Sequence, residues 1–453
     1  MNNCISYSPR ASLAIVGMNI QQMGIWDMIG QEVKIQQKTV THTPLQKLQD
    51  AFINIMAGGR GIVEVNQRVK PDVSLSCAFG RQKCADQSGV SATLNACQAE
   101  NVAQMRQAMA AVYRRYGAGY GHDYGRGCQL LDIDMSGMPA GRQGEGSEKG
   151  YFAKQKNKRG RQLGRVYATL YDEIVSERLY CGKTQLNRCL PELVAEAEAV
   201  LNLNPGFRKR TILRIDGGGG NDADINHLLT RSYKLLVKVT HWKRVEKLAA
   251  TVVTWQTDPK DPRRQAGWVP QPFAYDHPTR QLAVRCQTKK GNWQTAILVF
   301  NLDDDQLSWL NEQGKRSFSP PADPIWLAVY AYDLRGGGVE TAIKGSKQGL
   351  GIIKRNKKSF HAQEMLLLLG QLAYNVTAWV RHGLASCQAR LHQFGMLRMV
   401  RDAFHIAGLL AFDAEGHIVQ ISLNQAHNLA AAFIDAFASF LARDGTVANL
   451  RQI

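Results

Sequence analysis

Four acidic residues at the ends of apolar segments are the residues of this sequence best suited to chemistry. Asp132 and Asp134 lie in QLLDIDM (129–135), Asp216 ends TILRID (211–216), and Glu340 follows IWLAVYAY (325–332) and a run of glycines. Mg²⁺ prefers oxygen ligands, so two or three such carboxylates together with substrate phosphate oxygens make a suitable site. Two ions about 3.5 to 4 Å apart can assist phosphodiester cleavage or strand transfer.

Each acid also has a simpler interpretation. Aspartate before glycine is common in turns, and Glu340 by itself fits a solvated helix residue. Any one acid alone therefore favours the simple interpretation, whereas their joint occurrence favours a shared site. Both aspartate segments are followed by glycine-rich turns, so Asp134 and Asp216 will lie side by side if their strands are neighbours.

The elements that must position these acids follow from hydrophobic periodicity. Thr43 and Pro44 predict the start of a helix that ends before Gly58, and a second helix is predicted from about Glu100 to Tyr113. A glycine cluster at 117–127 marks a boundary. Beyond it, strands are predicted in 129–135, 164–180, 211–216, 248–255, 280–286, 292–302 and 325–332, a helix in 191–203, and further helices in 360–380 and 428–442.

These elements predict an α/β protein built around a mixed sheet. We expect five regions, with the following boundaries: a mainly helical N-terminal region 1–125, for which the family resemblance given below implies DNA binding, the first part of a core 126–243, a β-rich insertion 244–325, the last part of the core 326–390, and a C-terminal helical region 391–453.

Composition points to a polyanionic partner. Lysine and arginine number 56 against 38 acidic residues, which gives a formal net charge of +18. Nucleic acid is the simplest partner, because the apolar run 365–380 is interrupted by Gln371 and Asn375 and reads as a buried helix rather than a membrane span. No secretory signal is visible, so we expect a cytoplasmic protein without membrane association. Nine scattered cysteines without a Cys-x-x-Cys pair predict free thiols rather than a zinc site.

Three segments together resemble the DDE class of transposases from bacterial insertion sequences. LDIDMSGM resembles the first aspartate strand of that class, TILRIDGGGG resembles its second aspartate segment, and YDLRGGGVETAIKGSK resembles its Tyr-x-x-Arg…Glu-x6-Lys signature. Tyr332, Arg335, Glu340 and Lys347 fill the signature, with four residues rather than the usual three between Arg335 and Glu340. The three segments occur in the family order.

The resemblance implies an RNase H-like core interrupted by a β-rich insertion. It implies that Asp134, Asp216 and Glu340 hold Mg²⁺, for which Mn²⁺ is a possible substitute, and that Tyr332, Arg335 and Lys347 position the DNA backbone. The expected activity is cleavage at the inverted-repeat ends of a mobile element and transfer of the 3′-hydroxyl ends to target DNA, by a homodimer on double-stranded DNA. Asp132 is not at the catalytic position of the family.

A basic run after the first aspartate strand supports a nucleic-acid partner. We expect phosphate contacts from Lys154, Lys156, Lys158, Arg159 and Arg161, although a solvated loop is the alternative. Two rival functions remain from the sequence alone. One is a transposase-derived DNA-binding protein without catalytic activity, and the other is a nonspecific nuclease of the same fold.

Overall fold

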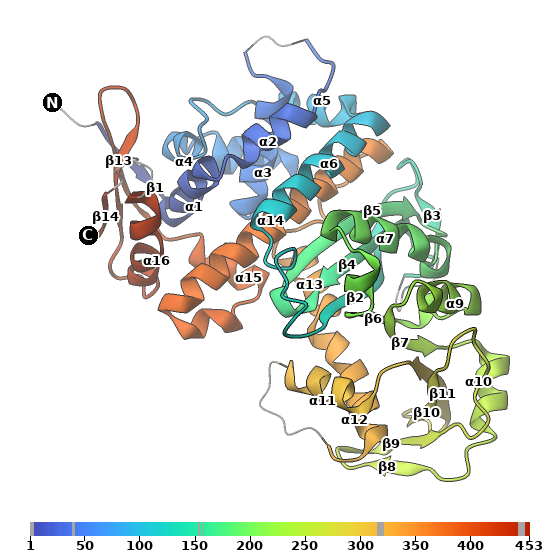
Figure 1. Ribbon diagram of the computed structural model, residues 1–453. Coiled ribbons are helices and arrows are strands. Elements are labelled where there is room, and N and C mark those ends of the chain that lie inside the picture. Colours follow the sequence, from blue (N-terminus) through green and yellow to red (C-terminus); the bar gives the residue numbers. More distant parts are fainter. Residues whose placement is uncertain (1–3, 39–40, 153–154, 156, 315–320, 443–448) are drawn as a thin grey trace. The chain divides into compact units, whose positions relative to one another are not determined.

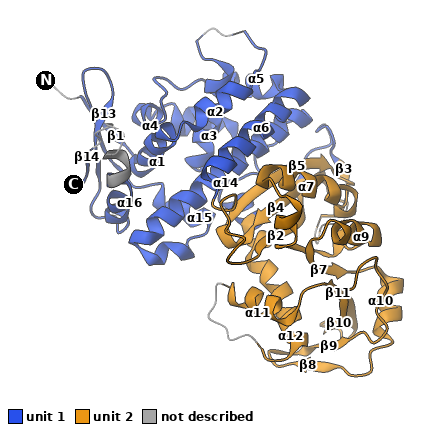
Figure 2. Ribbon diagram, viewed as in Figure 1, with its two compact units in different colours: residues 1–117, 139–147, 343–453 blue, residues 118–138, 148–342 orange. Residues whose placement is uncertain are grey.

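A computed structural model describes residues 4–38, 41–152, 155, 157–314, 321–442 and 449–453. The chain forms two compact units, each assembled from separate stretches of sequence (Figure 2). Unit 1 contains residues 1–117, 139–147 and 343–453, and unit 2 contains residues 118–138 and 148–342. Lys154 and Lys156 lie outside the described residues.

Unit 2 is built on one large mixed sheet. Among the described residues, ten strands join in the order β3-β4-β2-β6-β7-β11-β10-β9-β8, with β5 paired to β4 at the side (Figure 1). The strands are β2 (Gln129–Pro139), β3 (Glu148–Lys149), β4 (Arg159–Ala168), β5 (Glu173–Cys181), β6 (Thr211–Ile215), β7 (Lys234–Val239), β8 (Gln256–Asp258), β9 (Asp261–Trp268), β10 (Arg280–Gln287) and β11 (Trp293–Phe300). The mixed α/β class expected from the sequence is confirmed.

The centre of this sheet is parallel, and its far side is antiparallel. β2 pairs with β6 and β6 with β7 in parallel, and nearly all of the paired residues are buried, as expected for strands covered on both faces. β11 pairs antiparallel with β7, so the strands of the expected insertion extend the core sheet rather than forming a sheet of their own. The segment 248–255, predicted as a strand, is instead the end of a helix and a loop.

Helices complete unit 2 and cover its sheet. They are α7 (Leu186–Leu201), α8 (Pro205–Arg208), α9 (Asp222–Thr230), α10 (Trp242–Ala249), α11 (Asp304–Glu312), α12 (Pro324–Asp333) and the first part of α13 (Val339–Gln348). Apolar residues of α11 and α12 pack with Leu130, Ile212 and Leu236 of the three parallel strands in one buried cluster. The prediction of a strand at 325–332 is wrong, because this segment is helix α12.

The start of α12 explains why this apolar segment is helical. The Asp323 side chain accepts a hydrogen bond from the backbone N–H of Ile325, and Pro324 occupies the first turn. Both features favour helix initiation, since a side-chain oxygen satisfies a free N–H group and proline fixes a helical φ. Helix α12 therefore delivers Tyr332 and the following residues to the end of the parallel strands.

Unit 1 combines the N-terminal helices with the C-terminal part of the chain. Its helices are α1 (Ala11–Gln22), α2 (Ile25–Glu32), α3 (Pro44–Met56), α4 (Val73–Ala78), α5 (Gln87–Ala96), α6 (Ala99–Tyr116), α14 (Phe360–Cys387), α15 (Met396–Arg398) and α16 (Ala430–Ala442). The predicted helices near 45–56 and 100–113 correspond to α3 and α6, and Thr43 caps α3 as expected. The run 365–380 lies in α14 and is buried along almost its whole length.

The C-terminal region is not only helical, contrary to the sequence prediction. Strands β1 (Cys4–Ser8), β12 (Gly408–Phe412), β13 (Ile418–Leu423) and β14 (Asn449–Gln452) form a four-stranded sheet in the described part of unit 1, in the order β1-β12-β13-β14. The sheet therefore joins the first described strand of the chain to its last. This grouping differs from the expected division, which kept the N-terminal and C-terminal regions apart.

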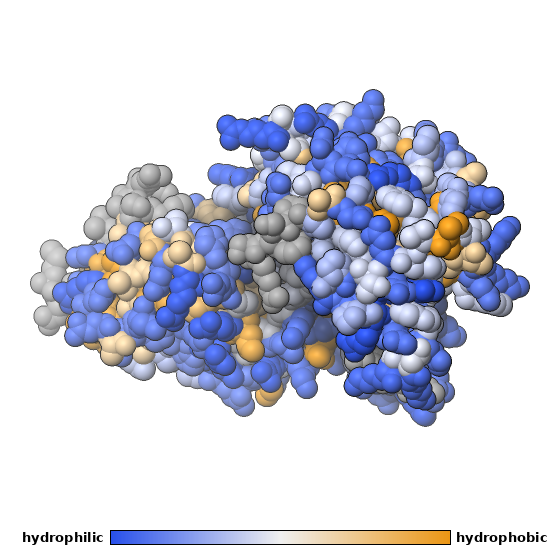
Figure 3. All heavy atoms as spheres, turned by 90° about the horizontal axis from the view of Figure 1, so that it is seen from below, coloured by the Kyte–Doolittle hydropathy of each residue, from blue (hydrophilic) through white to orange (hydrophobic). Residues whose placement is uncertain are grey.

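Much of one face of the molecule is hydrophilic (Figure 3). On the face drawn in Figure 3, hydrophilic side chains predominate and hydrophobic residues are scattered between them. No helix within the described ranges has both the length and the apolar character needed to cross a membrane.

Candidate functional site

The register of the parallel strands places Asp134 beside Asp216. On β2 and β6, Asp132 is opposite Arg214 and Ile133 is opposite Ile215, and the two aspartates come next on their strands. On β6 and β7, Ile215 is opposite Val237, so Asp216 and Lys238 follow at the equivalent position. Three neighbouring strands thus carry Asp134, Asp216 and Lys238 at one level of the sheet.

Asp132 and Arg214 form a buried ion pair one step below the two aspartates. Arg214 Nε donates to Asp132 Oδ1 over 2.6 Å and Nη2 donates to Oδ2 over 2.8 Å, with both side chains at most 1% exposed. Arg214 Nη1 also donates to the carbonyl of Ala331 on α12 over 2.7 Å. Residues i and i+2 of a strand share a face, so this pair lies beneath Asp134 and Asp216. Asp132 is therefore a structural residue, in agreement with its exclusion from the expected ligands.

Arg335 connects the first aspartate with Glu340. One guanidinium nitrogen, Nη2, lies 3.1 Å from Asp134 Oδ1, and the other, Nη1, donates to Glu340 Oε1 over 3.0 Å. The guanidinium is 3% exposed, whereas the Glu340 side chain at the start of α13 is 55% exposed. Arg335 lies in a short 3-10 helix, Leu334–Gly337, and this turn accommodates the extra residue between arginine and glutamate. The planar guanidinium suits such a bridge, because it offers several N–H donors in a fixed geometry.

Tyr332 holds the second aspartate. Its hydroxyl donates to Asp216 Oδ1 over 3.0 Å from the last turn of α12. Tyr332 and Arg335 therefore both contact carboxylates in this structure, and their expected role at the DNA backbone stays a prediction. The same interactions bring together Asp134, Asp216 and Glu340, which are far apart in the sequence.

The two aspartates differ in their electrostatic environment. Burial raises the pKa of Asp134 to about 6 against the effect of Arg335, and the nearby charges of Asp216 and Glu340 raise it further. Burial also raises the pKa of Asp216, but Arg335, the Gly217 N–H, Tyr332 and Lys238 outweigh burial and hold this pKa below its ordinary value. A carboxylate with a raised pKa next to an ionised one indicates a site where negative charge is concentrated.

A groove opens beside these aspartates. It has a volume of about 860 Å³, and Asp134, Asp216 and Lys238 lie in its wall together with the glycines that follow Asp216. Lys238 was not identified from the sequence. A signal for it was present, since KLLVKV is a third apolar segment with a polar residue near its end. Charged and polar side chains from several elements therefore line one open groove.

The acids fit a divalent cation by their chemistry. Asp134, Asp216 and Glu340 offer only carboxylate oxygens, the ligand type that Mg²⁺ and Mn²⁺ accept. Burial first, and then the charges of Asp216 and Glu340, raise the pKa of Asp134, so its ionised form is disfavoured, and a bound cation would favour that form. Their oxygens are not all within 4.8 Å of one another among the described residues, and Arg335 lies between Asp134 and Glu340.

The basic residues expected at DNA have different surroundings. Lys158 is exposed, and Arg159 at the start of β4 is partly buried. The prediction for Arg161 is wrong for this structure, because its side chain is only 1% exposed inside the sheet and cannot reach a phosphate without a rearrangement. Lys347 is partly buried on α13, seven residues after Glu340 and within unit 1.

A second acidic group lies elsewhere, in the turn between β12 and β13. Asp413, Glu415 and His417 place ligand atoms within 4.8 Å of one another, at a partly to fully exposed position. Asp413 Oδ1 accepts hydrogen bonds from the backbone N–H groups of Glu415 and His417. Its carboxylate thus stabilises a tight turn, which accounts for the grouping without a metal.

Comparison with known proteins identifies the family. The family model described as Transposase DDE domain group 1 matches residues 10–441. The solved piggyBac transposase synaptic complex with hairpin DNA is similar to this chain with a TM-score of 0.44 and 10% sequence identity, over 89% of this chain and 84% of that chain. A search of curated proteins found no match. Since the family model spans nearly the whole chain, the protein belongs to the family of transposases with a DDE domain of group 1.

Proposed function

We propose that this transposase uses a divalent cation, Mg²⁺ or Mn²⁺, to cut DNA at the inverted-repeat ends of its own mobile element and to join the 3′-hydroxyl ends to target DNA. The observation that carries the proposal is the placement of Asp134 and Asp216 on adjacent parallel strands, with Arg335 linking Asp134 to Glu340 at the same end of the sheet. Asp134 and Asp216 line a groove that suits a DNA strand.

The chemistry consists of two displacements at phosphorus. In cleavage, a water oxygen attacks the phosphorus at the element end, the bond from phosphorus to the 3′-oxygen breaks, and that oxygen leaves as a hydroxyl. In transfer, the 3′-hydroxyl oxygen attacks a target phosphorus and displaces the 3′-oxygen of the target strand. A divalent cation held by the acids would activate the attacking oxygen and stabilise the leaving one.

The residues of the chain have separate parts in this proposal. Asp134, Asp216 and Glu340 would hold the cation. Arg335 orients Asp134 and Glu340, and Tyr332 orients Asp216, because each donates directly to a carboxylate. Lys238 lies in the groove wall beside Asp216, where its charge suits a phosphate of the bound strand. Lys158 and Arg159 would contact DNA further along, and a dimer would hold two ends together.

The test uses purified protein and labelled duplexes that carry the inverted repeats flanking the reading frame. Mg²⁺ should produce a nick at the repeat end and, with target DNA added, a joined product. Asp134→Asn should lower cleavage by at least about 100-fold while DNA binding persists, since removal of a group that acts in the transition state affects rate more than binding. Asp305→Asn, an exposed acid in the first turn of α11, is the matched control and should cleave normally.

Two outcomes would replace the proposal. Specific binding to the repeats without any metal-dependent cleavage would indicate a DNA-binding protein that no longer cuts. Equal degradation of the repeats and of a duplex with scrambled sequence would indicate a nonspecific nuclease. Equal cleavage by the Asp134→Asn variant and the unmodified protein would remove the assigned role of the acids.

A further inference from the structure

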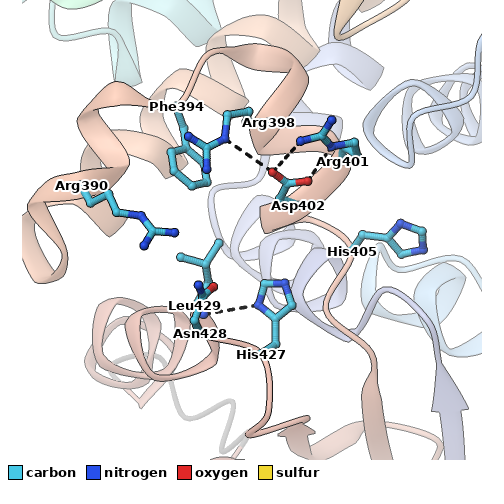
Figure 4. Close-up of a pocket in the computed structure, with 9 residues that line it drawn as sticks. All are labelled: Arg390, Phe394, Arg398, Arg401, Asp402, His405, His427, Asn428 and Leu429. Carbon is cyan, nitrogen blue, oxygen red and sulfur yellow. Dashed lines mark hydrogen bonds and ion pairs between the residues drawn. The ribbon is translucent and has the colours of Figure 1, made fainter.

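A second hollow lies in the C-terminal part of unit 1, and Asp134, Asp216 and Glu340 are not among the residues that line it. It encloses about 360 Å³ between the segment that follows α14 and the residues that precede α16. Figure 4 shows Arg390, Arg398 and Arg401 around this space. Positive side chains thus gather at a place to which the proposed chemistry assigns no role.

The charges lining the hollow do not balance. Three guanidinium groups meet one carboxylate, Asp402, with which Arg401 and Arg398 form ion pairs at 2.7 and 3.6 Å. Arg401 holds the pKa of Asp402 below its ordinary value against the effect of burial, and Arg398 adds to the lowering. A single ionised carboxylate therefore faces three permanent positive charges, which leaves an excess of two.

The arginines are held in place by an aromatic ring. The guanidinium carbon of Arg398 lies 3.7 Å from the centre of the Phe394 ring, and that of Arg390 lies 5.9 Å from the same centre. A guanidinium in contact with the face of a ring is restricted in its motion, while the N–H groups at its edge can still donate to an anion. In the described part of the chain, no carboxylate lies within 4.0 Å of Arg390, so this cation has no counter-ion.

His427 adds a neutral donor to the rim of the hollow. Its Nδ1 accepts a hydrogen bond from the backbone N–H of Leu429 over 3.3 Å, so the hydrogen of the neutral ring is on Nε2. Burial lowers the pKa of His427, which keeps the ring neutral near pH 7. Helix α16 begins directly after these residues and has no acidic side chain in its first turn, so nothing there opposes an anion.

We infer that this hollow binds phosphodiester groups of a DNA backbone. Two excess charges on stacked guanidinium groups, with a neutral N–H donor beside them, match one or two adjacent phosphates. The net charge of +18 favours DNA over an acidic peptide as the source of the anion. The inference shares only its DNA partner with the proposed function, since the hollow contains none of the residues assigned to cleavage.

The test compares the salt dependence of DNA binding between variants. Fluorescence anisotropy of a labelled duplex, measured over a series of NaCl concentrations, gives the slope of log K against log salt. Arg390→Gln with Arg398→Gln should reduce this slope by about 1.8, because each phosphate contact contributes about 0.9. The same relation predicts about 10-fold weaker binding per lost contact near 0.1 M salt.

Matched variants separate a local contact from general charge. Arg126→Gln removes one exposed charge in unit 2, where Arg126 pairs with Asp123, and should leave the slope almost unchanged. Arg390→Lys should keep most of the slope, because the charge remains. Arg390→Gln alone should lose about 0.9 without a change in melting temperature, since this exposed side chain has no ion pair to break.

The inference is overturned if the double variant keeps the slope of the unmodified protein or changes it no more than Arg126→Gln does. It is also overturned if the double variant loses affinity for poly-glutamate while its DNA binding stays intact, because the hollow would then serve an acidic peptide. The binding measurement does not require cleavage of the duplex. A failure of cleavage therefore leaves this result unaffected, and the two proposals can fail separately.

Discussion

Arg214 on β6 donates two hydrogen bonds, of 2.6 and 2.8 Å, to Asp132 on β2, and both side chains are buried. This pair sets the spacing and register of two parallel strands directly below Asp134 and Asp216. The third Arg214 donor reaches the carbonyl of Ala331, one residue before Tyr332, and so attaches α12 to the same point. A single buried cation thus aligns the two strands and the helix that carry the candidate site.

Arg214→Met should destabilise unit 2 by about 3–5 kcal/mol, because it removes the guanidinium that neutralises the buried Asp132 carboxylate. Thermal and denaturant unfolding followed by circular dichroism will measure the loss. Combining Arg214→Met with Asp132→Leu should recover much of the stability, since an apolar pair of similar volume needs no counter-charge. Arg263→Met breaks an exposed pair with Asp261 and should change stability little. Equal losses in the single and double variants would contradict this account.

Gly338→Ala should lower both stability and cleavage, whereas Gly337→Ala should change neither appreciably. A methyl group at position 338 would lie 2.5 Å from Asp132 Oδ2 and 3.0 Å from Thr169, while nothing lies within 4 Å of one at position 337. Glu340 lies two residues after Gly338, so a shift of the backbone at Gly338 should displace the Glu340 carboxylate. Melting temperature and cleavage of the repeat duplex are the measurements, and similar behaviour of the two variants would count against the close approach.

The acids of the site could be anticipated from sequence, but the contacts around them could not. Asp134 and Asp216 were found because each ends a short apolar segment, and parallel strands that are neighbours bring such ends together. The pairing of Asp132 with Arg214 spans 82 residues, and no local pattern reveals it. The burial of Arg161 also depends on long-range pairing. A run of basic residues in the sequence does not show which of their side chains a sheet will bury.

Helices and strands could be predicted where the apolar residues follow one clear period. They could not be predicted where pairing between distant segments determines the structure. The apolar segment 325–332 has no polar face, so its periodicity does not separate a buried strand from a buried helix, and Asp323 with Pro324 carried the decisive signal. Strand β12 pairs with β1 at the other end of the chain, so this sheet depends on contacts across almost the whole sequence. The extension of the core sheet by β11 is another such pairing.

Lys238→Met should weaken binding of the element end and reduce the salt slope by about 0.9, the contribution of one phosphate contact. Lys238 is next in register to Asp216 on a neighbouring strand and lies in the groove wall, where a phosphate of a bound strand would meet its charge. Lys238→Arg should retain most of the effect. Lys247→Met on α10 removes an exposed lysine outside the groove and is the control. An unchanged slope for Lys238→Met would show that the groove receives no backbone at this position.

Asp134→Asn should have opposite effects on stability without and with a divalent cation. Burial and the neighbouring acids raise the pKa of Asp134 to about 6, so the ionised carboxylate opposes folding above that pH. The neutral amide of Asp134→Asn should therefore raise the melting temperature at pH 7.5 in the presence of a chelator.

Mn²⁺ at about 100 times its dissociation constant should stabilise the unmodified protein by about 2.7 kcal/mol, and this gain should vanish in the Asp134→Asn variant. Glu415→Gln, in the turn between β12 and β13, should keep the full gain, because the Asp413 turn is stabilised by its own backbone hydrogen bonds. A Mn²⁺ effect that disappears in Glu415→Gln but persists in Asp134→Asn would move the cation from the sheet to that turn.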